Sequence, residues 1–369
     1  MRKSIAILDS DVHHRTHVSV MLQATYGMHG HGSWAMALPA MKAEHPDLII
    51  VGHQVGECSG VSAIRDIKRD RQLVNIPVIY IADRQDTRLR DQLLLLGVKA
   101  VLVKPLDPRA VMSVVTDLLT SEVEKSWQEL PPHQRKVLED TLSAFNNMAR
   151  GLANGQPPEI GPINEACSSL VDAMAQNELA PLLQKIRNHD NYTFVHSMRF
   201  AAFIGLFARA IGLPKQMQIQ VACGGLLHDM GMMVVPPYVM YKQSALTPEE
   251  WKQVRSHVAT GHRLLQAMGQ VSKGVEIIVT QHHERLDGSG YPNGLKGDQL
   301  NELARMAGII DVFCALTDRR PHKNPMSAES AFETMATTMG GQIDLALLPR
   351  FREILLESGS KDEPEVVWE

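Results

Sequence analysis

The sequence predicts a multidomain protein, with an N-terminal α/β domain built on a parallel sheet and an all-α C-terminal domain. Two observations predict this fold class: short apolar runs alternate with amphipathic stretches over about the first 120 residues, and long helical patterns without strands follow them. The length of 369 residues also exceeds that of one ordinary domain. We expect the α/β domain over 1–120, a helical connector over 121–158 and the helical domain over 159–369.

The N-terminal part is expected to contain buried strands, because continuous apolar runs are typical of a parallel sheet covered on both faces. Helix-like stretches at 61–69, 86–96 and 108–119 separate them. A weaker strand is expected near 27–32, where glycine and histidine interrupt the apolar pattern. The four clear strands are expected at 4–8, 47–51, 77–81 and 100–103.

After residue 121 the periodicity is helical, and the alternating pattern of strands is not found. The first helical stretch covers 123–152 with an interruption at Pro131 and Pro132, and the breaker-rich segment 154–158 is expected to be a turn. The helices that follow predict an all-α bundle. They are expected at 163–176, 192–211, 215–227, 248–268, 271–283, 303–316 and 328–337.

The composition narrows the class of protein. A content of 44% hydrophobic and 21% charged residues is typical of a globular protein, and a net charge of −4 gives no reason to expect nucleic-acid binding. The four scattered cysteines fit a reducing compartment, and no apolar run is long enough for a membrane helix. The basic start reaches Asp9 too early for a signal peptide. We expect a cytoplasmic protein without a membrane or nucleic-acid partner.

Two polar residues stand at strand ends in the N-terminal part. Asp9 follows the first strand, and Lys104 follows the last strand and precedes Pro105. With these residues and its alternation of strands and helices, the segment 1–120 resembles a response-regulator receiver domain. The resemblance implies a flavodoxin-like strand order and a phosphorylation site made of an acidic pair, a phosphoacceptor Asp, a Thr or Ser and a Lys.

The residues that a receiver uses for its chemistry are mostly replaced in this chain. Ser10 stands at the second acid of the pair, Gly52 at the phosphoacceptor and Ala82 at the Thr/Ser position. A glycine has no carboxylate to form an acyl phosphate, and lost carboxylates weaken Mg²⁺ binding, which Asp11 restores only in part. We expect a fold kept for docking or dimerisation, which leaves a homodimer open.

A set of histidines and aspartates in the helical part lies in apolar surroundings. Most of the sixteen histidines need only a solvated or capping role, but this set falls at helix ends and within core-like helices. Burying unpaired imidazoles and carboxylates costs several kcal/mol, so they must be paired or metal-bound. Five such clusters in one domain predict a shared metal site. The residues are His196, His228, Asp229, His257, His282, His283 and Asp311.

Three strings around these residues resemble one family. Residues 228–232 read HDMGM, 282–292 read HHERLDGSGYP and 310–317 read IDVFCALT. From about 191 to 348 the chain resembles the HD-GYP domain, the subgroup of HD phosphohydrolases that hydrolyses cyclic di-GMP. The resemblance implies two divalent transition metals, with Fe or Mn favoured and Zn or Ni also suited to the donor set.

The same resemblance implies a role for each residue. Asp229 would bridge both metals and is the predicted catalytic residue. One metal would take His196, His228 and Asp311, and the other His257, His282 and His283. Tyr192 stands where members with a third metal carry Glu. Of the substrate-binding residues that it implies, Tyr291 lies in the tight loop 288–292, and Arg320 and Lys323 would hold phosphate or simply lie on the surface. Glu284 and Asp287 would orient ligand histidines or make turn contacts.

At two positions the sequence differs from the family motif, and these differences leave two possible functions. Met232 replaces the lysine that reaches substrate phosphate, and Cys314 replaces an aspartate, a change expected to loosen support for the ligands. One reading is a working cyclic di-GMP phosphodiesterase that gives pGpG or GMP, with a receiver used for docking. The other is a slow or inactive protein that binds metal and senses the nucleotide or binds a partner, such as a diguanylate cyclase. A different HD-superfamily substrate is the least favoured reading.

Overall fold

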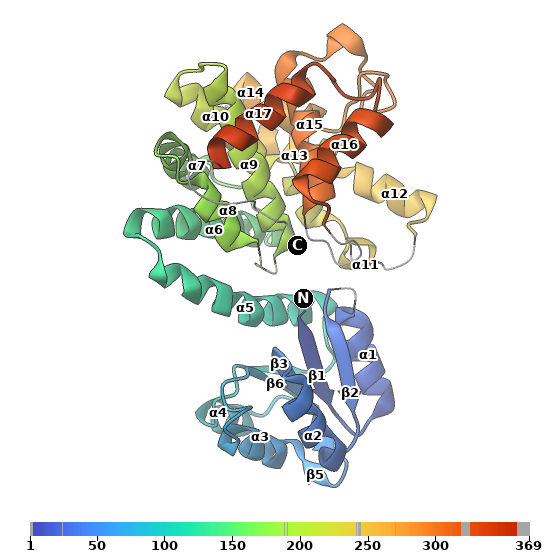
Figure 1. Ribbon diagram of the computed structural model, residues 1–369. Coiled ribbons are helices and arrows are strands. Elements are labelled where there is room, and N and C mark those ends of the chain that lie inside the picture. Colours follow the sequence, from blue (N-terminus) through green and yellow to red (C-terminus); the bar gives the residue numbers. More distant parts are fainter. Residues whose placement is uncertain are drawn as a thin grey trace. The chain divides into compact units, whose positions relative to one another are not determined.

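The computed structural model describes residues 3–23, 25–187, 189, 191–240, 242, 245–269, 271–318 and 325–359. The chain divides into two compact units, one of Met1–Glu122 with Tyr241–Gln243 and one of Val123–Met240 with Ser244–Glu369 (Figure 1). The first is α/β and the second is helical, which confirms the predicted fold class. None of the helices in the described ranges is both long and apolar enough to cross a bilayer.

The first unit is built on a five-stranded parallel sheet with the order β2-β1-β3-β6-β7. This is the flavodoxin-like order that the receiver resemblance implies. A short antiparallel pair, β4 (Gln54–Val55) with β5 (Cys58–Ser59), was not expected. The sheet strands are β1 (Ser4–Leu8), β2 (Gly27–His31), β3 (Leu48–Val51), β6 (Val78–Ala82) and β7 (Ala100–Val103).

Each face of this sheet carries its own apolar core, because successive side chains of a strand point to opposite faces. Ile5 and Ile7 of β1 pack in the core that includes α1 and α5, whereas Ala6 and Leu8 pack in the core that includes α2, α3 and α4. Two of these helices, α1 and α2, were missing from the expected pattern. The helices are α1 (Val12–Leu22), α2 (Trp34–Glu44), α3 (Gly60–Arg69), α4 (Thr87–Leu95) and α5 (Pro108–Ser126).

Beside Asp9, at the end of β1, there is no room for a phosphoacceptor side chain at position 52. The Asp9 carboxylate is buried, and its Oδ2 lies 2.5 Å from His14 Nδ1. A Cβ atom on Gly52 would fall 2.0 Å from the same oxygen. Lys104, which the receiver family uses at the site, pairs instead with Asp83 at 2.7 Å. His14 therefore pairs with Asp9, and the neighbouring position 52, where the phosphoacceptor was expected, is a glycine.

The second unit contains helices throughout, and its described residues include no strand beyond the isolated bridge between Asp287 and Lys296. The segment 123–158, expected as a connector, belongs to this unit, because Trp127, Leu138 and Phe145 lie in its main apolar core. The N-terminal elements are η1 (Trp127–Glu129), α6 (Pro132–Ala153), α7 (Ile160–Ala175), α8 (Leu179–Ile186), α9 (Tyr192–Ala210), α10 (Lys215–Leu227), η2 (Met230–Val234) and α11 (Pro237–Met240).

In the rest of the second unit, one predicted helix is in fact two helices. A single helix was expected over 248–268, with His257 inside it, but the chain breaks at Ser256 and His257 is the first residue of a new helix. The break leaves the Val254 carbonyl to accept a hydrogen bond from the His257 ring at 2.7 Å. These elements are α12 (Pro248–Arg255), α13 (His257–Ala267), α14 (Lys273–Gln281), η3 (Gly297–Gln299), α15 (Glu302–Thr317), α16 (Ala328–Thr338) and α17 (Leu347–Gly359).

The buried centre of the second unit is α9, in which every residue from Phe194 to Ala208 is buried. Helix α10 packs closely on it at Gly225, where a Cβ atom would fall 2.6 Å from the Ala201 Cα. Only glycine permits this approach of the two backbones. The close packing brings the C-terminal end of α10 beside the first turns of α9.

We predict that the first unit does not accept phosphate from a small donor such as acetyl phosphate. Gly52 offers no carboxylate, and the neighbouring Asp9 is engaged by His14. Intact-protein mass spectrometry after incubation with acetyl phosphate and Mg²⁺ should show no added phosphate. Covalent phosphate located within residues 1–120 would contradict this prediction.

Candidate metal centre

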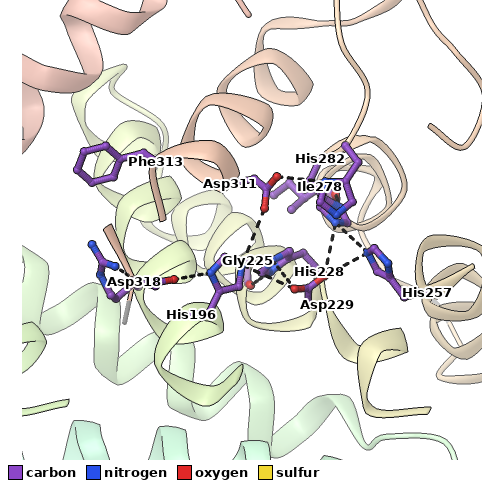
Figure 2. A network of polar contacts seen from close by, with 12 residues as sticks. His196, Gly225, His228, Asp229, His257, Ile278, His282, Asp311, Phe313 and Asp318 are labelled. Carbon is purple, nitrogen blue, oxygen red and sulfur yellow. Dashed lines mark hydrogen bonds and ion pairs between the residues drawn. The ribbon is translucent and has the colours of Figure 1, made fainter. Parts of the chain in front are cut away.

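Seven side chains with metal-binding chemistry come together where five helices of the second unit meet. Figure 2 shows His196, His228, Asp229, His257, His282 and Asp311. His196 comes from the first turns of α9, and Asp311 from the middle of α15. The other residues lie at helix ends, because His228 and Asp229 follow α10, His257 begins α13, and His282 and His283 follow α14. All seven residues that the sequence singled out are therefore neighbours.

The Asp229 carboxylate lies between two pairs of histidines. Its Oδ2 is 3.7 Å from His196 Nε2 and 3.5 Å from His228 Nε2. Its Oδ1 is 3.2 Å from His257 Nε2 and 3.7 Å from His282 Nε2. Dashed lines in Figure 2 mark the contacts of this carboxylate. Oδ1 is buried and has no hydrogen-bond partner within the described part of the chain. A carboxylate with one oxygen toward each pair has the geometry of a ligand that bridges two cations.

Backbone carbonyls fix the tautomer of three of these rings. A carbonyl oxygen only accepts, so the ring nitrogen beside it must carry the hydrogen and the opposite nitrogen of a neutral ring keeps its lone pair. In each case Nδ1 donates and Nε2 faces Asp229. The bonds run from His228 to Gly225 (2.7 Å), from His257 to Val254 (2.7 Å) and from His282 to Ile278 (2.9 Å).

The Nε2 atoms also face one another. Those of His196 and His228 are 3.2 Å apart, and those of His257 and His282 are 3.4 Å apart. Lone pairs at this separation repel unless a cation or a proton lies between them. Burial lowers the pKa of His228 to about 3 and that of His283 to about 4, so both rings are neutral near pH 7, the form that binds a metal. The residues present therefore fit metal ions.

The seven residues divide into two groups, and in each group the potential ligand atoms lie within 4.8 Å of one another. Asp311 also reaches across the groups, because its Oδ1 is 3.9 Å from His196 Nε2 and its Oδ2 is 3.1 Å from His283 Nδ1. Although burial raises the pKa of Asp311, His283 and its neighbours hold it well below the usual range. The groups are His196, His228 and Asp311, and Asp229, His257, His282 and His283.

Two glycines permit close contacts around the centre. A Cβ atom on Gly231 would fall 2.0 Å from the His257 carbonyl oxygen, so η2 lies directly against the start of α13. A Cβ atom on Gly290 would fall 2.5 Å from the His283 carbonyl oxygen, so the loop after α14 folds back on its own helix end. The first contact places Asp229 beside His257, and the second places Tyr291 beside His283.

Asp318 supports His196 and was not identified from the sequence. Its Oδ2 lies 2.7 Å from His196 Nδ1, and its Oδ1 accepts a hydrogen bond from the buried guanidinium of Arg199. A carboxylate behind a ligand histidine orients the ring and makes it a stronger ligand. Cys314 lies one helical turn earlier, and its Sγ falls within 4.8 Å of His196 and Asp318 ligand atoms. His196 therefore keeps a carboxylate partner despite the replacement at Cys314.

Glu284 and Asp287 hold the loop after α14 in the structure, so the alternative of turn contacts applies to both. The buried Glu284 carboxylate accepts hydrogen bonds from the Asn293 N–H at 2.7 Å and the Leu295 N–H at 2.9 Å. The exposed Asp287 accepts from the Ser289 N–H at 2.8 Å. Both carboxylates thus accept hydrogen bonds from loop backbone, as the turn-contact alternative describes.

Tyr291 is the substrate-binding candidate that the structure places at the centre. Its ring centroid lies 4.7 Å from that of His283 and 6.3 Å from that of His257. Burial raises the pKa of Tyr291, so its hydroxyl keeps its proton and can donate a hydrogen bond. The other two candidates, Arg320 and Lys323, lie outside the described residues.

Comparison with known protein families assigns both units. A family described as HD domain matches residues 170–347, and a family described as response regulator receiver domain matches residues 5–116. The chain is a receiver domain followed by an HD domain. The HD match includes all seven residues of the centre, and the receiver match includes the Asp9 pocket.

Two curated relatives match long stretches of this chain. The chain is 32% identical over 232 residues to cyclic di-GMP phosphodiesterase PA4108 from Pseudomonas aeruginosa, covering 63% of this chain and 56% of that protein. It is 27% identical over 366 residues to cyclic di-GMP phosphodiesterase response regulator RpfG from Xanthomonas campestris pv. campestris, covering 98% and 89%. The chain thus spans little more than half of the first relative and most of the second.

Among solved structures, the chain resembles Bd1817, a HDG"Y"P protein from Bdellovibrio bacteriovorus. The TM-score is 0.50 with 18% sequence identity, and the match covers 66% of this chain and 80% of that one. At this identity the similarity supports the fold of the HD domain alone.

We predict that Asp229→Asn releases both metals of the HD domain, whereas His257→Ala mainly releases one. Asp229 faces both histidine pairs with separate oxygens, and His257 belongs to one group. Elemental analysis of the purified variants should give about two ions per chain for the wild type, fewer than one for Asp229→Asn and about one for His257→Ala. A wild type that stays metal-free after anaerobic loading with Fe or Mn would contradict the site.

We predict that Asp318→Asn weakens metal binding at the His196 group by about 10- to 100-fold, because the ring loses its carboxylate partner. Competition with a chelator measures the affinity, and the exposed Asp298→Asn serves as the matched control. Adding Cys314→Asp to Asp318→Asn should restore part of the affinity, since the new carboxylate lies one turn earlier on the same side of α15. Equal loss of both metals, with no rescue by Cys314→Asp, would contradict the assigned role.

Proposed function

We propose that this chain is a metal-dependent phosphodiesterase that hydrolyses cyclic di-GMP. The observation that carries the proposal is the Asp229 carboxylate, which faces two pairs of imidazole Nε2 atoms in an HD domain. Two relatives are named cyclic di-GMP phosphodiesterases, and the matches cover 56% and 89% of their lengths. Their names support cyclic di-GMP as the proposed substrate.

The charge balance of the centre suits an anionic substrate. The seven proposed ligands include two carboxylates and five imidazoles, so two divalent cations keep a net charge of about +2 when the imidazoles are neutral. Such cations lower the pKa of a water molecule toward neutrality and withdraw charge from a phosphoryl group. Iron or manganese is the proposed metal, and the imidazole and carboxylate donors also suit zinc or nickel.

The protein side chains have separate tasks in this proposal. Asp229 would hold the two cations, and Asp311 would add a second carboxylate, with one oxygen toward His196 and the other toward His283. The Tyr291 hydroxyl keeps its proton and donates a hydrogen bond to the substrate. Addition of one water across one P–O bond of the ring gives linear pGpG, and a second hydrolysis gives GMP.

A slower enzyme or a nucleotide sensor is the second candidate, and Met232 favours it. Met232 lies in η2, and its N–H donates to the Asp229 carbonyl at 2.8 Å, so it stands next to the bridging residue. A methionine there brings no positive charge to a phosphate. In that case the receiver domain would dock a partner, such as a diguanylate cyclase, or a second copy of the chain.

We predict that the full-length, metal-loaded protein converts cyclic di-GMP into pGpG or GMP, whereas Asp229→Asn does not. We also expect Met232→Lys to raise kcat/KM by about tenfold, equivalent to ~1.4 kcal/mol, because an ammonium group near Asp229 stabilises the charge of the transition state. Product formation is followed by liquid chromatography at equal metal content, with thermal unfolding as a check on folding.

The two candidate functions give different results in this assay. A wild type that binds cyclic di-GMP but leaves it intact favours the sensor. A Met232→Lys protein that is folded and metal-loaded but no faster than wild type excludes the methionine as the limiting residue.

A further inference from the structure

Helix α12 carries an aromatic side chain and a cation that no part of the proposed metal chemistry uses. No residue of this helix is buried, and Trp251 is 48% exposed. The helix is held at its start by a capping box, in which Thr247 Oγ1 accepts from the Glu250 N–H and Glu250 Oε2 accepts from the Thr247 N–H. Trp251 thus remains on the surface of a helix with a capped N-terminus. Exposure of a tryptophan ring to water is unfavourable compared with its burial.

A row of flat groups connects Trp251 with the metal centre. The Arg255 guanidinium lies one helical turn after Trp251, at 6.0 Å from its ring centroid. The same guanidinium lies 5.3 Å from the ring centroid of Tyr291, which in turn lies 4.7 Å from His283 at an interplanar angle of 31°. The four side chains form a continuous series from a proposed metal ligand to an exposed indole.

An open hollow of about 470 Å³ lies at the outer end of this series. Its volume falls in the range of small-molecule sites, and two of its five lining residues are cationic. The lining residues are Leu246, Pro248, Trp251, Lys252 and Arg255.

We propose that Trp251 and Arg255 form a nucleobase subsite that holds one guanine of the cyclic dinucleotide beside the metal centre. The proposal rests on the proposed function, since it assigns the base of the same substrate. An indole face stacks on a purine, and a guanidinium fork matches the O6 and N7 acceptors of guanine. Adenine offers a donor where guanine offers O6, so Arg255 discriminates between the two bases.

The subsite is tested with two substrates that share the metal centre but differ in their bases. Bis(p-nitrophenyl) phosphate is a phosphodiester without a nucleobase, so its hydrolysis reports on the metal centre alone. For cyclic di-GMP we expect Trp251→Ala to raise KM about tenfold and Trp251→Phe to keep most of the affinity, with kcat and bis(p-nitrophenyl) phosphate hydrolysis unchanged. Arg255→Ala should raise KM similarly and reduce the preference for cyclic di-GMP over cyclic di-AMP. Arg263→Ala, an exposed arginine on α13, is the matched control and should behave like wild type.

A binding measurement separates the subsite from catalysis. Titration of the full chain with cyclic di-GMP in the presence of EDTA should quench tryptophan fluorescence, and Trp251→Phe should remove most of the quenching. Quenching without hydrolysis would support the subsite while the proposed hydrolysis fails. A Trp251→Ala protein with unchanged KM and unchanged quenching overturns the subsite while leaving hydrolysis intact. Absence of both quenching and hydrolysis in the wild type overturns both proposals.

Discussion

The carboxylate of Asp229 and the four imidazoles around it constrain the arrangement of the whole HD domain. One oxygen faces His196 and His228, and the other faces His257 and His282, so four helices must bring their ends or first turns to one point. Burying this set without a compensating charge costs several kcal/mol. Carbonyl acceptors behind three of the rings hold their orientation, and glycine at two of the closest backbone contacts, Gly225 and Gly231, lets the elements that carry them approach.

The support of His196 comes from a residue outside the motif on which the resemblance was based. The resemblance implies a carboxylate at position 314, where this chain has Cys314, and the carboxylate of Asp318, one helical turn later, contacts the ring. Asp318 is also paired with the buried Arg199, which in turn donates to Thr317 at 2.9 Å. One buried carboxylate thus balances a buried guanidinium and a ligand imidazole. The arrangement is sensitive to loss of any one partner, because an unpaired buried charge is strongly destabilising.

The receiver domain separates fold from chemistry. The apolar side chains of its parallel strands fill two cores. Of the three substituted positions, Ser10 and Gly52 lie outside both cores, and Ala82 lies in one of them as an apolar residue. The sheet therefore forms without the phosphorylation chemistry. In the pocket itself, His14 supplies a partner for Asp9 where receivers hold Mg²⁺ with several carboxylates. Docking and dimerisation remain the proposed roles of this domain.

The sequence alone determined the elements whose periodicity is strong. Four strands of the five-stranded sheet, most helices of the second unit and the seven residues of the centre followed from apolar runs and from polar groups at their ends, because such patterns report which face of an element is buried. Strand β2 was a weaker prediction, and the short pair β4 and β5 was not expected. Two N-terminal helices were missed, since the histidines of α1 and Pro39 within α2 weaken the helical pattern. The break before His257 was also missed, because the apolar pattern continues across Ser256.

Tertiary structure decided which side chains meet. The contact between His196 and Asp318 joins residues 122 positions apart, and no local pattern specifies it. Whether Glu284 reaches a ligand histidine or the loop depended on the fold of residues 288–295, which turn back onto α14 at Gly290. The row from His283 through Tyr291 and Arg255 to Trp251 likewise combines a loop and two helix ends. Hydrophobic periodicity encodes burial, whereas the partner of a polar group is set by packing between distant segments.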